Sequence, residues 1–253
     1  MINQLLHRQP LAVDRDAHRQ LRIDVPITDW SVASRLNSLF VAAVEFADAC
    51  REYPIVFVRA GKDPAGKEQI APVAVFGMAQ EENLFLDGTR WRAAYLPAQL
   101  RLYPFCIGRL DEQRFAICFD SAWGGASHDK GQALFDADGK PTELMDNVQK
   151  QMEAFEKEVQ RTRLVGDKLL ELDLLRDMRF DAELPGGQKL SVDGFLTVDE
   201  AKLNALPDAR LLELQRSGLL GLIHAHFISL GNMRRLAEWR AQRQVAMAPG
   251  GTA

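Results

Sequence analysis

The chain has 253 residues, of which 47% are hydrophobic and 26% charged, and its formal net charge at pH 7 is −4. This composition is typical of a folded globular protein and excludes wholesale disorder. An acidic chain without a long basic stripe also argues against a nucleic-acid partner. A small basic excess near the C-terminus is better explained as a solvated helix face: Arg234, Arg235, Arg240 and Arg243.

The three cysteines, Cys50, Cys106 and Cys118, stand among apolar neighbours without paired spacing. We therefore expect buried free thiols in a reducing compartment. The first residues lack the apolar core of a secretory signal, and no stretch approaches the ~20 apolar residues of a membrane span. We expect a cytoplasmic protein without a membrane span.

The first fifty residues predict one extended segment and one helix. Apolar and polar side chains alternate over residues 21–28, which is typical of a strand or an arm packed on one face. Between Leu36 and Cys50 the apolar residues recur at helical spacing, which predicts a half-buried helix. Ser34 is the expected cap of that helix, and Pro54 ends it.

Most predicted strands lie between residues 55 and 120. Short apolar runs predict buried strands over 55–58, 72–78 and 84–86, and a helical turn over 97–102. Residues 105–110 and 114–119 form the arms of a predicted hairpin. The short connections favour an antiparallel or mixed sheet over repeated strand–helix–strand units.

The second half predicts mainly helices. After a long polar connection over 121–142, of a kind that is often functional, Thr142 is the expected cap of a helix through Val159. A further helix-prone stretch covers 164–178. Residues 180–184 and 190–198 predict a second hairpin, turned at 185–187.

Three helices are expected after this hairpin. Thr197 and Glu200 form a capping-box pattern ahead of a short helix through Leu206. The next helix covers 209–217 and ends at Gly218, a residue that easily adopts the left-handed conformation. The last one covers 219–242.

The predicted fold class is α+β, with an antiparallel or mixed sheet in the first half and a mostly helical second half that contains one additional hairpin. We expect a single domain over residues 1–253, with a flexible tail over 247–253. A subdivision near residue 140 stays open.

The segment from Arg101 to Phe105 is the strongest indication of a binding site. A guanidinium beside aromatic rings can clamp a carboxylate or stack on a ring. Tyr103, with Trp91 and Trp123 nearby in the sequence, would then form an aromatic site for a peptide or a sugar. The alternative is an arginine paired with a structural acid while the aromatic rings fill the core.

Histidines offer weaker candidates. His224 and His226 lie two residues apart in a helical run, so they face roughly opposite sides and one metal ion could not take both. His226 could bind a ligand or act as a base, but a hydrogen-bonded packing histidine is the simpler account. His128 is directly followed by Asp129, a spacing that does not match an iron-binding facial triad.

Two carboxylate patterns also have simpler explanations. The Asp136-Ala137-Asp138-Gly139 segment resembles the start of a calcium loop, but the later ligands are missing, so a tight turn is expected. Glu45 and Glu52 could form an acid–base pair only if both lined one pocket; otherwise they are helix-surface charges.

Motifs of several large enzyme classes are missing from the sequence. It contains no Gly-x-Gly-x-x-Gly turn, phosphate loop, Gly-x-Ser-x-Gly elbow or Cys-x-x-Cys pair. We predict no bound cofactor and no metal site, and the catalytic residues, if there are any, stay unknown.

Four groups of segments, spread over about residues 20–240, together resemble the SapC family of bacterial proteins, which is distinct from the transporter permease of the same name. They are Glu45-Phe46-Ala47 with Glu52-Tyr53-Pro54-Ile55-Val56-Phe57; Trp91 with Leu96-Pro97-Ala98-Gln99-Leu100-Arg101 and Tyr103-Pro104-Phe105; Gly194-Phe195 with Val198-Asp199-Glu200-Ala201-Lys202-Leu203 and Leu206; and Ser217-Gly218 with Ala225-His226 and Ser229-Leu230.

The resemblance implies a single SapC-like domain and an association with bacterial surface layers or nutrient uptake, with cell-envelope association open. It implies no reaction. The leading hypothesis is a non-catalytic binding or accessory protein that recognises a peptide, a glycan or a protein partner, with ligand-binding candidates Arg101, Tyr103, Trp91, Trp123 and His226. The sequence leaves open whether the chain forms a homo-oligomer.

The alternative hypothesis is an enzyme of unknown class, metal-dependent or not, that acts on a peptide or small molecule. Its site would combine scattered residues: Arg101, Asp120, His128 and His226. The sequence does not decide whether the protein is an enzyme, but the missing motifs argue against it.

Overall fold

The computed structural model describes residues 2–109, 115–183 and 189–247. The chain divides into two compact units, each built from three separate stretches. Unit 1 contains Met1–Arg35, Leu86–Arg92 and Ala98–Lys157, and unit 2 contains Leu36–Phe85, Ala93–Pro97 and Glu158–Ala253. The single domain expected from the sequence stays a prediction, and most of the expected tail lies outside the described residues.

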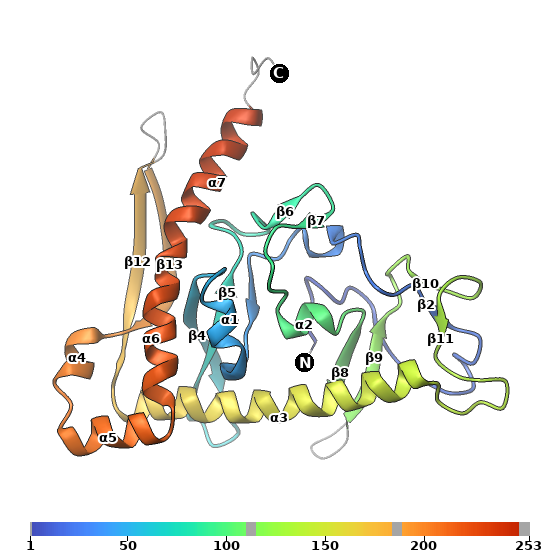
Figure 1. Ribbon diagram of the computed structural model, residues 1–253, viewed down its shortest axis with the longest axis horizontal. Coiled ribbons are helices and arrows are strands. Elements are labelled where there is room, and N and C mark those ends of the chain that lie inside the picture. The colour runs from blue at the N-terminus through green and yellow to red at the C-terminus, as the bar shows by residue number, and fades with distance from the viewer. Residues whose placement is uncertain (1, 110–114, 184–188, 248–253) are drawn as a thin grey trace. The chain divides into compact units, whose positions relative to one another are not determined.

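Helices and antiparallel sheets together make up both units (Figure 1), so the predicted α+β class is confirmed. In unit 1, β8 (Phe105–Arg109) and β9 (Phe115–Asp120) form the predicted antiparallel hairpin, and β1 (Pro10–Ala12) pairs with the other edge of β9. The connection between the two predicted arms lies outside the described residues. Phe105 and Phe119 are opposite each other and buried, so this hairpin contributes directly to the core.

A smaller sheet organises the long connection of unit 1. β2 (Arg22–Ile23) pairs on its two edges with β10 (Ala126–Ser127) and β11 (Gln132–Ala133). The connection predicted over 121–142 therefore contains two short strands. The strand predicted over 21–28 is shortened to β2, and irregular chain follows it.

Shorter elements complete this part of the unit. They are η1 (Ser31–Ala33), the hairpin of β6 (Leu86–Asp87) and β7 (Arg90–Trp91), and the predicted helical turn, which is confirmed as α2 (Ala98–Arg101).

The long helix α3 (Glu143–Glu171) continues through Gly166 without a break (Figure 1). One face of it is buried: Met145, Val148, Met152, Phe155 and Val159. The hydroxyl of Thr142 donates to the carbonyl of Ala133, 2.8 Å away, and so ties the start of α3 to β11. The helical stretch predicted through residue 178 is wrong at its end, because the chain from Leu175 onward is a strand.

Unit 2 is organised by a five-stranded antiparallel sheet in the order β12-β13-β4-β5-β3. Its strands are β3 (Ser38–Phe40), β4 (Ile55–Lys62), β5 (Glu68–Val75), β12 (Leu175–Glu183) and β13 (Lys189–Val198). The second predicted hairpin is confirmed as β12 and β13, and its turn lies outside the described residues. It joins the sheet where Leu196 pairs with Phe57.

The helix predicted between Leu36 and Cys50 is wrong. The chain there forms β3, the 3-10 turn η2 (Ala43–Glu45) and the single helical turn α1 (Phe46–Ala49). Ser34 ends η1 and caps no helix over this stretch. Consecutive apolar residues suit an edge strand as well as a helix, and pairing of Leu39 with Ala74 of β5 decides for the strand.

Among the described residues, β13 is followed by the helices α4 (Glu200–Asn204), α5 (Asp208–Arg216), α6 (Leu219–Leu230) and α7 (Asn232–Met247). Gly218 is left-handed with φ 78°, as predicted. The cap of α4 is Asp199, whose carboxylate accepts from the N–H groups of Ala201 and Lys202, and the capping box predicted on Thr197 is wrong.

The single helix predicted over residues 219–242 is divided at Gly231. The side chain of Asn232 donates to the carbonyls of Cys50 and Tyr53, at 2.9 and 3.2 Å. These hydrogen bonds to residues far away in the sequence direct α7 away from the axis of α6.

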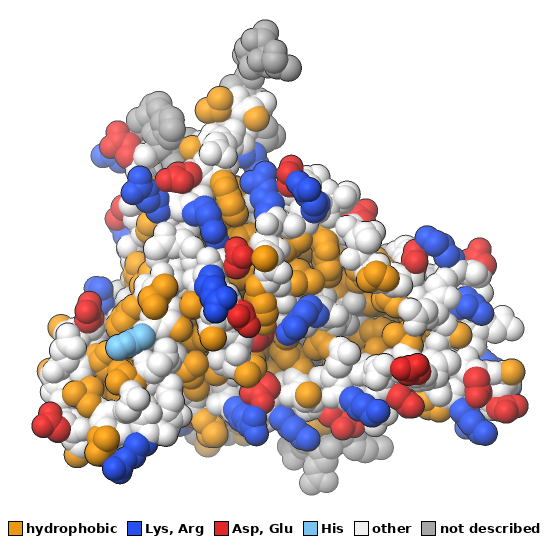
Figure 2. All heavy atoms as spheres, in the orientation of Figure 1, with side chains coloured by type: hydrophobic (Ala, Val, Ile, Leu, Met, Phe, Trp, Pro, Cys, Tyr) orange, Lys and Arg blue, Asp and Glu red, His pale blue; other side chains and the backbone are white. Residues whose placement is uncertain are grey.

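Figure 2 shows basic and acidic side chains interspersed over the face in view, with apolar side chains between them. No described helix combines the length and the apolar character that crossing a membrane requires.

Candidate functional site

A buried carboxylate anchors one end of unit 1. Asp120, at the end of β9, is 1% exposed. Its Oδ2 accepts the hydroxyl of Tyr103 at 2.9 Å, and its Oδ1 accepts the backbone N–H groups of Gln9 at 2.9 Å and Ala122 at 3.3 Å. A charge can be buried when hydrogen bonds satisfy its lone pairs in this way. Burial and the bond to Asp120 raise the pKa of Tyr103, so the phenol stays a neutral donor.

His7 packs beside this cluster as a neutral ring. Its centroid lies 5.8 Å from that of Tyr103. Its Nδ1 lies 3.1 Å from the N–H of Asn3 and accepts from it, so the proton of the neutral ring is on Nε2. Burial lowers the pKa of His7 to about 4. Nε2 has no hydrogen-bond partner among the described residues.

Trp123 is held on two sides. Its ring meets Tyr103 edge-on, with 5.7 Å between centroids. A Cβ atom at Gly125 would lie 2.3 Å from Cζ2 of the indole, so only glycine leaves room for the ring at that side. The indole is half-buried and oriented by its neighbours before any ligand arrives.

This indole lines an open groove of about 670 Å³ within unit 1. The other walls come from Arg8, residues 24–29, and the loop that contains Gly124 and Lys130. The volume lies in the range of small-molecule sites, which combine apolar walls with a few orienting polar groups.

The charges of the groove balance only in part. Lys130 and Asp24 form an ion pair at 2.6 Å, which raises the pKa of Lys130. The hydroxyl and backbone N–H of Ser31 donate to Asp29 and lower the pKa of that carboxyl. Neither Asp29 nor Arg8 has an ion-pair partner among the described residues. The groove therefore offers one cation and one anion to a ligand.

The structure brings together two of the predicted ligand-binding residues, Tyr103 and Trp123. Trp91 is buried in β7 and packs edge-on against Trp30, 6.4 Å between centroids. Arg101 ends α2 with an exposed side chain. Neither Trp91 nor Arg101 lines the groove, and their assignment to a binding site stays a prediction.

His226 is a packing histidine inside unit 2. Its Nδ1 lies 2.7 Å from the carbonyl oxygen of Ile55, which can only accept, so Nδ1 carries the proton. Its Nε2 then accepts from the hydroxyl of Thr197 at 2.8 Å and from the N–H of Val198 at 3.2 Å. Burial lowers the pKa of His226 to about 4. Both nitrogens are used, which leaves none for a ligand.

None of the four residues suggested for an enzyme lines the groove of unit 1. Both oxygens of Asp120 already accept hydrogen bonds, and the side chains of His128 and Arg101 are exposed. His226 belongs to unit 2.

Glu45 and Glu52 both contact the segment Ala93–Pro97 within unit 2. Glu45 is 4% exposed, and its carboxylate accepts the hydroxyl of Tyr95 and the N–H of Ala42, each at 2.8 Å. Glu52 accepts the N–H of Ala94 at 3.3 Å. Glu45 is therefore a buried anchor, and the expectation of a helix-surface charge is wrong for it.

The remaining sequence candidates have structural roles. Asp136 accepts from the N–H groups of Asp138 and Lys140, which makes the expected tight turn. The three cysteines are free and buried, as predicted. Within the described ranges, no three or more His, Cys, Asp or Glu side chains are grouped so that they could hold a metal ion.

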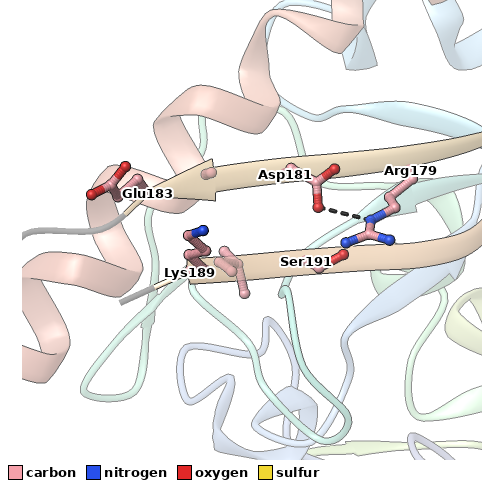
Figure 3. Close-up of a pocket in the computed structure, with 7 residues that line it drawn as sticks. Arg179, Asp181, Glu183, Lys189 and Ser191 are labelled. Atoms are coloured by element: carbon pink, nitrogen blue, oxygen red, sulfur yellow. Dashed lines mark hydrogen bonds and ion pairs between the residues drawn. The ribbon is translucent and has the colours of Figure 1, made fainter. Parts of the chain in front are cut away.

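A second depression, of about 410 Å³, lies on the hairpin of β12 and β13 in unit 2 (Figure 3). Arg179 and Asp181 pair there at 2.8 Å, and Ser191, Lys189 and Glu183 complete a polar lining without an aromatic ring. It is smaller than the groove of unit 1 and has no aromatic ring to cover a ligand, so we regard it as the weaker candidate.

The fold and the groove define an α+β protein with a ligand-sized groove on an antiparallel scaffold. The SapC family model matches residues 13–236, so this chain belongs to the SapC family. No curated protein and no solved structure matches it.

Sequence reasoning missed Arg8, Asp24, Asp29 and Lys130 as groove residues. They are far apart in the sequence and share no motif. Pairing of β2 with β10 and β11 brings their segments together. The one available signal was the long polar loop after β9, which was kept as a functional candidate.

Proposed function

We propose that this protein is a non-catalytic binding protein and that the groove of unit 1 holds its ligand. The observation that carries the proposal is the position of Trp123, which lines the groove while Tyr103 and Gly125 hold its ring. A ring that is already oriented offers a large contact area and loses little conformational entropy on binding.

The groups beside the indole would orient the ligand. Arg8 supplies a guanidinium that suits a carboxylate or phosphate. The Lys130–Asp24 pair rims the groove with a donor and an acceptor. This combination of one aromatic surface and few polar groups is typical of recognition sites.

Membership of the SapC family supports a proposal for the biological role. We infer that the protein serves surface-layer biogenesis or nutrient uptake as an accessory protein, and that its ligand is a peptide, a glycan or a segment of a protein partner. We also propose that it acts from the cytoplasm, which fractionation of bacterial cells with an antibody against the chain would check.

The test is a ligand screen by thermal shift with short peptides and saccharides, followed by calorimetry on the full chain. Trp123→Ala should weaken any ligand found by at least about tenfold, which corresponds to 1.4 kcal/mol. Trp30→Ala, which also removes an indole from unit 1 but outside the groove, should leave the affinity unchanged. Equal effects of the two substitutions would contradict the proposal.

The enzyme alternative is tested with the same compounds by product analysis. Turnover that is abolished by His128→Gln or Arg101→Gln, in a chain with unchanged circular dichroism, would replace the binding proposal. Trp123→Ala in the same assay would show whether such a reaction uses the groove.

A further inference from the structure

The two unpaired charges of the groove restrict the ligand that fits it. Arg8 and Asp29 both line it, and no ion pair joins them to each other or to another described residue. The adjacent opposite charges, Lys130 and Asp24, already neutralise each other. A ligand that complements the groove therefore carries both an anionic and a cationic group.

Between these charges the groove wall is apolar. Val25, Ile27 and Val32 are half-buried and line it together with Trp123. Such a wall gains free energy by covering an aliphatic group. A sugar would place hydroxyl groups against this surface and leave them without partners.

The backbone of the same wall is available for hydrogen bonds. Ile27 and Thr28 make no backbone hydrogen bond with the part of the chain that the structure describes. Unpaired main-chain N–H and C=O groups are those with which proteins bind extended peptides.

We infer that the groove binds a short peptide with free ends, its carboxylate at Arg8, its ammonium group at Asp29 and an aliphatic side chain on the apolar wall. This inference rests on the proposed function and names its substrate class. The guanidinium can hold the carboxylate through two parallel hydrogen bonds. Asp29 accepts from Ser31, and because it is an exposed carboxylate with about four lone-pair sites, it can also accept from the ammonium group.

The probes are the tripeptide Ala-Leu-Ala, its N-acetylated form and its C-amidated form, each titrated into the full chain by calorimetry. The unmodified tripeptide should bind. Each cap should weaken binding by about tenfold or more, because it removes one charge-assisted hydrogen-bonded pair. A series from two to five residues identifies the length that spans the two charges.

The variants assign each end of the peptide. In Arg8→Gln the C-terminal amide should cause no further loss, and in Asp29→Asn the N-terminal acetyl group should cause none. Arg15→Gln and Asp16→Asn are matched controls, because they make the same charge changes at an exposed pair of unit 1. Both controls should retain the full effect of each cap.

The outcomes separate the inference from the proposed function. The inference is overturned if the tripeptide binds and neither cap weakens its binding. It is also overturned if every variant affects the capped and the free peptides equally. A saccharide that binds in a Trp123-dependent manner while no peptide binds overturns the inference but supports the proposed function. If no probe in either class binds in a Trp123-dependent manner, both fail.

Discussion

Nδ1 of His226 lies 2.7 Å from the carbonyl oxygen of Ile55, and this hydrogen bond joins α6 to β4 inside unit 2. With the two bonds at Nε2, it leaves the neutral ring without a free hydrogen-bonding atom. A proton added to Nε2 would displace two donors in a buried site.

Unit 2 should therefore lose stability in mild acid. The pKa of His226 is about 4 in the folded chain and 6.5 ordinarily. As the pH falls below 6.5, His226 becomes protonated in the unfolded chain, whereas in the folded chain it stays neutral until about pH 4. The free energy of unfolding therefore decreases by about 2 kcal/mol between pH 7 and pH 5.

Urea unfolding at the two pH values measures this loss. His226→Gln should reduce the difference between pH 7 and pH 5 by about the same 2 kcal/mol, whereas the exposed His224→Gln on the same helix should leave it unchanged. His7, whose pKa is also about 4, adds its own loss equally in all three chains. The same pH difference in both variants would contradict the assignment.

The Tyr103–Asp120 bond should be worth a measurable part of the stability of unit 1. Tyr103→Phe leaves Asp120 with backbone donors alone, and an underbonded buried carboxylate costs about 2 kcal/mol. Denaturant unfolding gives the cost. Asp120→Asn should reduce the free energy of unfolding less in the Tyr103→Phe chain than in the wild type. The difference is a coupling energy of at least about 1 kcal/mol. Additive effects would show that the two side chains act independently.

Two glycines in helices of unit 2 should respond to alanine with opposite signs. A Cβ at Gly166 of α3 would lie 2.5 Å from the carbonyl oxygen of Ile70, whereas one at Gly221 of α6 meets nothing within 4 Å. Gly221→Ala should stabilise by about 0.5–1 kcal/mol through helix propensity. Gly166→Ala should destabilise by about 1–2 kcal/mol because the backbone has to move. Melting temperatures of the two variants check this, and two shifts of the same sign would contradict the close approach of α3 to β5.

The start of α4 should depend on Asp199. Asp199→Ala removes the acceptor of two N–H groups and should cost about 1 kcal/mol. Glu200→Ala, the change that would matter most in a capping box after Thr197, should cost less than about 0.5 kcal/mol. Unfolding free energies of the two variants decide between the two caps, and a larger loss for Glu200→Ala would favour the capping box.

Local sequence signals were sufficient for elements whose cause is local. The apolar run at 55–58 became β4, both hairpins formed where strand patterns flank a turn, and Gly218 takes the left-handed conformation that ends a helix. The predictions failed where contacts with residues far away in the sequence determine the local structure. The stretch from Leu36 to Cys50 has helical spacing, but β5 offers a strand partner, and Asn232 bonds to carbonyls almost two hundred residues earlier.

The sequence by itself determined that this is an α+β protein of the SapC family, because apolar periodicity and short motifs are written along neighbouring residues. Only the tertiary structure decided which side chains share the groove. Arg8, Asp29 and Trp123 have no common motif, and strand pairing between segments about a hundred residues apart places them together. Such pairing depends on the free energy of the whole folded chain, which no local pattern contains.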